Sequence, residues 1–180
     1  SMAETGTALG LDANGGENIL GSADGGVIVD VIAEKGAGTG LNAIKSGSNT
    51  ITAGAGGAEI DVDGVSDAKG LAASSKGANT VISNGDIDIH AAASGSSSST
   101  TATGMHVKTG SSNNLSTKQD GDIRVTAEAE KATAYAMRAE GGENSISGSG
   151  DAILSAVGKT AYAMHASSGS NSVEAVNVDM

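Results

Sequence analysis

The stretch GLNAIKSGSNTITAGAGGAEIDV, which runs from Gly40 to Val62, holds three short apolar segments separated by small and polar residues. The segments centre on Leu41, on the aliphatic residue that follows Asn49 by two positions, and on Ile60. Apolar residues alternate with other residues in each segment, which is the period of a β-strand, and the Gly and Ser between them are typical of turns. The stretch therefore predicts three strands joined by tight turns.

The same three-part pattern occurs six times along the chain. Each copy opens with a small residue followed by Leu or Met: Gly10-Leu11, Gly40-Leu41, Gly70-Leu71, Gly104-Met105, Ala136-Met137 and Ala163-Met164. An Asn follows in each copy: Asn18, Asn49, Asn79, Asn113, Asn144 and Asn171. An alternating segment closes each copy: Val27–Val31, Ile60–Val62, Ile87–Ile89, Ile123–Val125, Ala152–Leu154 and Val176–Val178. Self-similarity at a period of about 30 residues is the mark of a repeat architecture.

Three strands of three to five residues cannot bury a core alone, but they can when coils stack on one another. The sequence therefore predicts an all-β fold, a parallel β-solenoid of about six coils with three short strands per coil. The Leu/Met column faces inward, and the next residue faces outward because side chains alternate along a strand. The small residue before each Leu or Met is expected at a tight corner where a Cβ atom would clash.

The composition excludes several classes of protein. The 180 residues include 28 Gly, two Tyr and no Pro, Cys, Trp or Phe, so there is no disulfide framework and no aromatic core. The absence of Pro favours β-ladders over disorder. A net charge of −11 argues against binding to nucleic acid or to an anionic membrane surface. No apolar stretch reaches the length that spans a membrane as a helix, and no cofactor is expected.

Residues 1–2 are interpreted as an expression-tag remnant, and residues 3–180 as a single solenoid domain cut from a longer repeat array. One connection, Ala91–Thr103, is expanded and includes a run of Ser and Thr. Insertions in solenoids form loops that often carry binding. Val27–Gly40 and Thr126–Ala134 are interpreted as milder versions of the same connection.

Three polar features are candidates for function. The Asn column is interpreted as a hydrogen-bonded ladder in the turn. Acidic residues before the third strand are interpreted as turn caps, with calcium as the alternative, and no metal site is assigned: Glu59, Asp86, Asp122 and Asp151. The outward residues of the later coils are the candidate binding residues, as a carbohydrate or protein contact patch or as ordinary ladder packing: Tyr135, Tyr162, His106, Arg138 and His165. No catalytic residue is assigned.

The recurring Ala-x-Gly-[Leu/Met]-x-Ala, Asn-x-[Ile/Leu/Val] and Gly-Asp-Ile-x-Val resemble passenger domains of bacterial autotransporters of type V secretion. The resemblance covers nearly the whole chain from Ala3 to Met180. It implies a right-handed β-helix displayed at the bacterial outer membrane or secreted, which acts as a non-enzymatic adhesin or stalk. A host or matrix protein or a glycan is the partner that it implies, and the membrane barrel of such proteins is not in this chain.

Three alternatives remain open. Asn171-Ser172-Val173 and Thr7–Gly10 resemble fragments of trimeric autotransporter adhesin heads, although a 30-residue coil is expected to close its own core as a monomer. A β-helical polysaccharide-active enzyme would need paired carboxylates, which only the column of Glu59 and the column of Asp61 and Asp88 offer. The third alternative is a purely structural spacer.

Overall fold

The computed structural model describes residues 1–3 and 6–180, and these residues contain strands and turns but no helix. All strand pairs in this part of the chain are parallel. Each coil has three faces, and equivalent Asn residues of successive coils lie 31, 30, 34, 31 and 27 residues apart. The predicted β-solenoid of six coils with about 30 residues per turn is confirmed.

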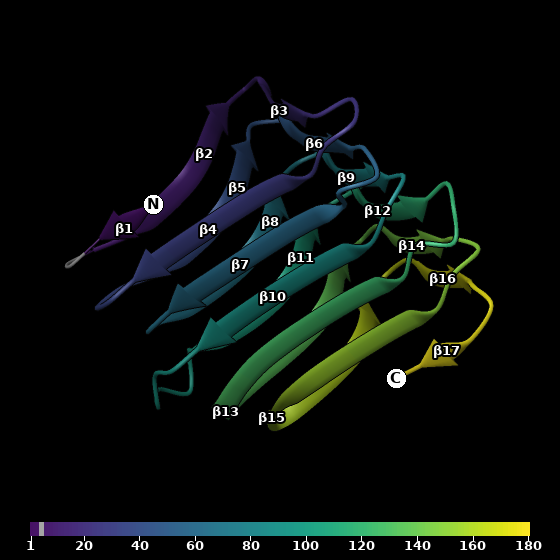
Figure 1. Ribbon diagram of the computed structural model, residues 1–180. Coiled ribbons are helices and arrows are strands. Elements are labelled where there is room, and N and C mark those ends of the chain that lie inside the picture. The colour runs from purple at the N-terminus through teal and green to yellow at the C-terminus, as the bar shows by residue number, and fades with distance from the viewer. Residues whose placement is uncertain (4–5) are drawn as a thin grey trace.

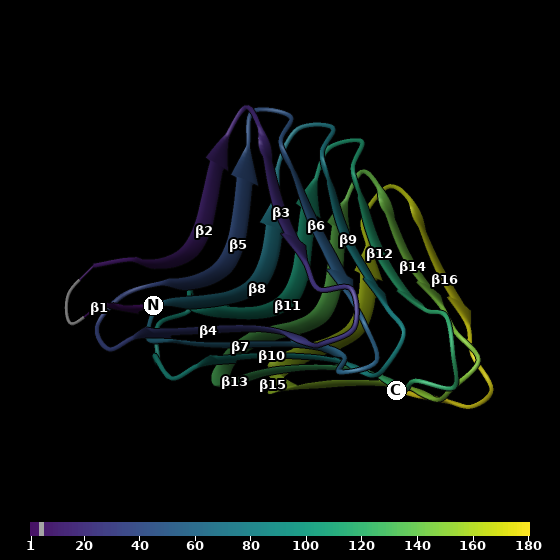
Figure 2. The same ribbon diagram turned by 45° about the horizontal axis from the view of Figure 1, so that its top comes forward.

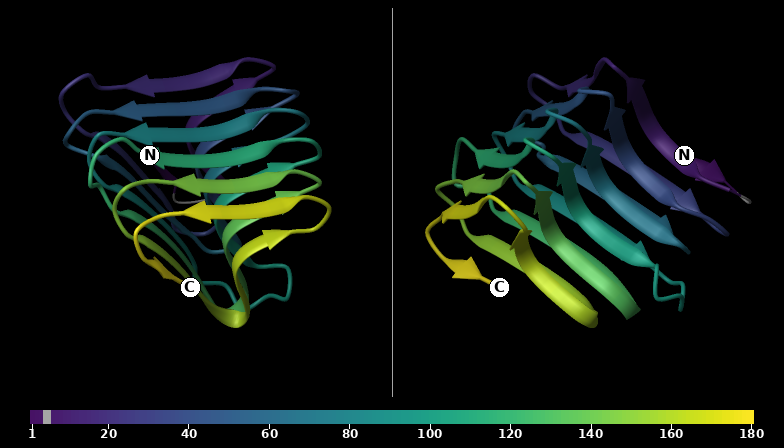
Figure 3. Two further views of the ribbon diagram at one scale, coloured as in Figure 1. Left: turned by 90° about the vertical axis from the view of Figure 1, so that its right-hand side faces the viewer. Right: turned by 180° about the vertical axis from the view of Figure 1, so that it is seen from behind.

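The first face, here called the leucine face, contains the Gly-Leu motif. Its strands are β2 (Ala8–Asn14), β5 (Gly38–Ile44), β8 (Asp67–Ala73), β11 (Thr101–Lys108) and the second parts of β13 (Ile123–Glu140) and β15 (Ala152–Ala166). The second face, the asparagine face, is a six-stranded sheet. It consists of β3 (Glu17–Gly21), β6 (Ser48–Ala53), β9 (Ala78–Ser83), β12 (Ser112–Thr117), β14 (Glu143–Ser147) and β16 (Ser170–Glu174). These strands stack in one layer in Figure 3.

The third face, the isoleucine face, contains the alternating segments. It consists of β1 (Met2–Ala3), β4 (Val27–Ala33), β7 (Ala58–Gly64), β10 (Ile87–Ala93), the first parts of β13 and β15, and β17 (Val178–Asp179). The two termini lie at opposite ends of the stack (Figure 1). Viewed from the N-terminal end, as in Figure 2, the strands run clockwise while the chain recedes, so the coil is right-handed.

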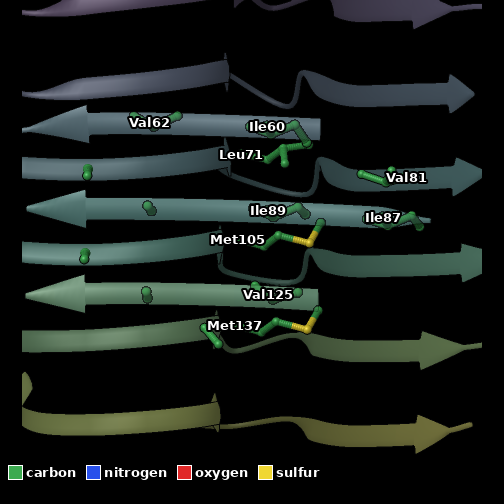
Figure 4. Close-up of a cluster of buried hydrophobic side chains, with 14 of the residues drawn as sticks. Ile60, Val62, Leu71, Val81, Ile87, Ile89, Met105, Val125 and Met137 are labelled. Atoms are coloured by element: carbon green, nitrogen blue, oxygen red, sulfur yellow. The ribbon is translucent and has the colours of Figure 1, made fainter. Parts of the chain in front are cut away.

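Small aliphatic side chains fill the interior. Leu71 aligns with Met105, which aligns with Met137, and all three side chains are fully buried. Ile60 and Ile89 of the isoleucine face are buried in the same cluster (Figure 4). Every coil adds to one continuous core, which is how a chain without Phe or Trp buries enough apolar surface.

The Leu/Met column, which was expected to face inward in every coil, is less buried in the two terminal coils. Leu11 of the first coil is 36 % exposed and Met164 of the last is only partly buried, because no neighbouring coil covers one side of them.

Two predicted connections are wrong. Val27–Ala33 is strand β4, so the first connection is confined to residues 34–37. Thr126–Ala134 lies inside β13, which continues from the isoleucine face to the leucine face without a break, with a register shift between Ala129 and Thr133. Buried Ala alternates with more exposed residues on both sides of one slip at Glu130-Lys131, and this pattern signals a strand. The expanded connection is real but shorter than predicted, because only residues 94–100 lie outside strands.

The predicted clash at the Gly before each Leu or Met is confirmed, although the Gly lies at a bend inside a strand. A Cβ atom on Gly70 would lie 2.5 Å from the carbonyl oxygen of Gly104 and 2.7 Å from Cγ2 of Ile89. Gly70 and Leu71 are both buried, so the alternation slips by one residue and the strand bends, as Figure 2 shows for this face. Ala136 takes this place in the fifth coil, where a methyl group is accommodated.

We predict that Gly70→Ala lowers the free energy of unfolding by about 1–3 kcal/mol, because the added methyl group overpacks the core. Gly16→Ala is the control, since a Cβ atom there has no neighbour within 4 Å. It is expected to change stability by less than about 0.5 kcal/mol. Urea denaturation measures both, and equal costs would contradict the close packing at the bend.

Candidate functional site

All five predicted binding residues meet on the outer side of the leucine face. Tyr135 aligns with Tyr162, and Arg138 aligns with both His106 and His165, because β11, β13 and β15 pair in register. The long strands β13 and β15 therefore place one Tyr before the bend and one cationic or imidazole side chain after it in each coil. We call these five residues the binding cluster.

The two tyrosines form the aromatic part of the cluster. Their rings are stacked with centroids 5.0 Å apart and an interplanar angle of 8°. His165 meets both rings edge-on at 5.5 and 5.0 Å. The Cζ atom of Arg138 lies 4.6 Å from the centroid of the Tyr135 ring, which is within the range of a cation–π contact. Tyr162 is 39 % exposed, so it is the ring that a ligand reaches most easily.

His106 was expected to be exposed, and this is wrong. Its side chain is only 8 % exposed, although it faces outward from β11. Glu140 accepts a hydrogen bond from Nε2 of His106 at 3.3 Å and forms an ion pair with Arg138, whose Nη2 lies 2.6 Å from the same carboxylate oxygen. The side chain of Glu140 thus joins neighbouring coils and covers the imidazole, a contact that strand alternation alone does not reveal.

Burial and charge set the protonation of this group. Burial and then the nearby Arg138 charge lower the pKa of His106 to about 4, against the opposing charge and hydrogen bond of the Glu140 carboxylate. Burial alone would raise the pKa of Glu140, but the Arg138 and His106 charges and the His106 hydrogen bond hold that pKa below its usual value. At neutral pH the cluster therefore contains a neutral His106 and an ion pair of Arg138 with Glu140.

The acidic column was predicted with one wrong member. Glu59 lies inside β7 and aligns with Asp88, so it does not stack with Asp86. The other acids cap one another's coils: Asp86 accepts a hydrogen bond from the backbone N–H of Asp122 at 2.9 Å, and Asp122 accepts one from that of Asp151 at 2.9 Å. The predicted capping of the local turn is wrong for these acids, because each donor belongs to the next coil.

The sequence analysis did not predict one cluster of two carboxylates and an imidazole. Asp61 and Asp63 lie on the outer side of β7. Asp61 aligns with His90 and not with Asp88, so the predicted column of Asp61 and Asp88 is wrong. Nδ1 of His90 lies 2.9 Å from a carboxylate oxygen of Asp61, and ligand atoms of all three residues lie within 4.8 Å of one another. Burial, followed by the charges of Asp61 and Asp30, raises the pKa of Asp63 despite His90. The spacing Asp61-Val62-Asp63, with a His one coil later, was the available signal.

The comparisons with known proteins identify no relative. No family model, no curated protein and no solved structure matches the chain. Among the residues that the structure describes, no helix has the length and apolar character needed to cross a bilayer.

We predict that His106 makes stability depend on pH between 6.5 and about 4. The folded pKa of about 4 lies below the usual histidine pKa of 6.5, so in this window the unfolded chain binds a proton that the folded chain resists. The free energy of unfolding therefore falls as pH falls from 6.5 to about 4. Over this range, the fall in the free energy of unfolding is expected to be about 2 kcal/mol smaller for His106→Gln than for wild type. Urea denaturation at pH 7, 5.5 and 4.5 measures it, and identical pH slopes in both proteins would refute the assignment.

Proposed function

We propose that this chain is a non-enzymatic passenger segment of autotransporter type, displayed at a bacterial surface or secreted, and that it binds a host or matrix protein or a glycan. The observation that carries the proposal is the binding cluster. Five residues that the sequence singled out from three different coils form one connected network on the outside of the solenoid.

The placement of the cluster supports a binding role. The strands that carry His106, Tyr135 and Arg138 are held by parallel ladders on both sides, so these side chains have little conformational entropy left to lose. The part of β15 that carries Tyr162 and His165 pairs with β13 on one side. Tyr and Arg are the residue types that dominate binding energy at protein interfaces. Some of the equivalent outward positions in earlier coils hold small side chains, such as Thr39 and Ala72, which offer a ligand little contact area.

The coil geometry favours the passenger over a trimeric adhesin head. One chain closes its own core in each coil of about 30 residues, and the buried column needs no second chain. This arrangement supports a monomer in solution. If the chain is a purely structural spacer, the binding cluster has no ligand, so a binding assay distinguishes the spacer from the adhesin.

We predict that Tyr162→Ala weakens binding to the recognised matrix protein or glycan about tenfold, because the most exposed ring of the cluster is lost. Val157→Ala, an exposed apolar residue on the same strand, is the control and should leave affinity within about twofold. Biolayer interferometry against a panel of matrix proteins and glycans measures both.

Incubation of the same ligands with the protein tests the enzyme alternative. We expect no product, and turnover that Asp86→Asn or Asp122→Asn abolishes would overturn the non-enzymatic assignment. Absence of binding to every member of the panel would leave the spacer as the better account.

A further inference from the structure

Two departures from the regular coil meet at one corner of the solenoid. The first is the loop 94–100 between β10 and β11, which projects at the end where β13 and β15 turn from one face to the next (Figure 1). The second is the irregularity in β13. Ala129 aligns with Gly158 and Thr133 with Thr160, so three residues of β13 stand opposite Lys159 alone. Such bulges re-aim side chains and are enriched next to functional sites.

These two irregular segments enclose a pocket of about 300 Å³. Its polar lining consists of hydroxyl and ammonium groups from three separate elements: Ser96, Ser98, Lys131, Thr133, Lys159 and Thr160. Among the described residues, no carboxylate lines it, although the chain has 21 acidic residues and a net charge of −11. A pocket of about 480 Å³ on the isoleucine face is the opposite case, since Glu34, Asp63, Glu128 and Glu130 all line it.

The pocket brings two like charges together. Lys131 and Lys159 come from neighbouring coils and both line it, and neither makes an ion pair within the described residues. Two ammonium groups in one pocket repel each other, and a bound anion removes that repulsion while Ser and Thr hydroxyls donate hydrogen bonds to it. The chemistry of the lining thus suits an anionic oxygen group such as sulfate or carboxylate.

The pocket is continuous with the binding cluster. Thr133 and Thr160 in its lining precede Tyr135 and Tyr162 by two residues on the same strands, so these side chains share the outer side of the sheet. Arg138 follows beyond the bend. A ligand that lies on Tyr162 therefore has ammonium groups within reach on one side and a guanidinium on the other.

We propose that the Lys131–Lys159 pocket is an anion subsite of the binding cluster, and that the ligand of the cluster is an acidic glycan whose sulfate or carboxylate group lies between the two ammonium groups. This inference rests on the proposed function and narrows its ligand class. A sugar chain fits the other features of the strip, because its hydroxyl groups match the Ser and Thr lining and its C–H faces match the exposed tyrosine ring.

The test compares two double variants that carry the same charge change. Lys131→Gln/Lys159→Gln removes the pocket ammonium groups, and Lys35→Gln/Lys118→Gln removes two exposed ones outside the pocket. Calorimetry measures binding to heparin, which carries sulfate, to hyaluronan, which carries only carboxylate, to neutral dextran and to polyglutamate. Circular dichroism and thermal melting establish that all three proteins are folded.

We expect wild type to bind heparin or hyaluronan and to ignore dextran, and the pocket variant to lose about tenfold in affinity. The control variant should lose less than about twofold. If the pocket variant loses affinity for heparin alone, the bound group is a sulfate, and if it loses affinity for hyaluronan as well, a carboxylate suffices.

The inference would be overturned if both double variants lost the same affinity, or if wild type bound polyglutamate as tightly as it binds the acidic glycans. It would also be overturned if wild type bound neither heparin nor hyaluronan. The proposed function fails by a different result, namely that Tyr162→Ala leaves the affinity for every matrix protein and glycan unchanged.

Discussion

The hydrogen bond from one asparagine side chain to the next is the interaction on which the rest of the solenoid depends. The Nδ2 atom of Asn18 donates to Oδ1 of Asn49 at 2.8 Å, and the chain of bonds continues through Asn79 and Asn113 to Asn144 and Asn171 at 2.7, 2.9, 2.8 and 2.8 Å. An amide both donates and accepts, so it can repeat along a stack, whereas a column of carboxylates would repel. The four middle side chains of this ladder are at most 1 % exposed.

The ladder also anchors the bend of the leucine face. Asn79 donates to the carbonyl oxygen of Leu71 in its own coil at 3.3 Å and to that of His106 in the next coil at 3.0 Å. These carbonyls follow the Gly-Leu bend, where the strand turns toward the asparagine face. The amide thus satisfies backbone groups that would be costly to bury unpaired, and it fixes the register of each coil on the next. With register fixed, the outward columns stack in order, and the binding cluster follows from that order.

The repeat made the fold predictable, because three motifs recurring six times define the inner columns, the coil length and the parallel pairing. The ladder was predicted as well, but in the turn, whereas Asn79 is the second residue of a strand. The repeat placed Tyr135 and Tyr162 correctly at equivalent positions of neighbouring coils, whereas they face outward because the alternation slips at the bend, where Ala136 and Met137 are both buried. The burial of His106 was not predictable, since it depends on the path of the Glu140 side chain across a coil. The pocket at Lys131 could not be predicted for a similar reason, because a strand bulge and a loop from another coil form it together.

The neighbouring residues Asn113 and Asn114 offer the most direct test of the ladder. Asn113 is fully buried and bonds the next coil, whereas Asn114 faces outward and its side chain bonds the hydroxyl of Ser112 on its own strand. Asn113→Ala is expected to lower the free energy of unfolding in urea by about 3 kcal/mol, because its partners stay buried without hydrogen bonds. Asn114→Ala should cost less than about 1 kcal/mol. Equal costs for the two variants would contradict the claim that the asparagine ladder holds the coils in register.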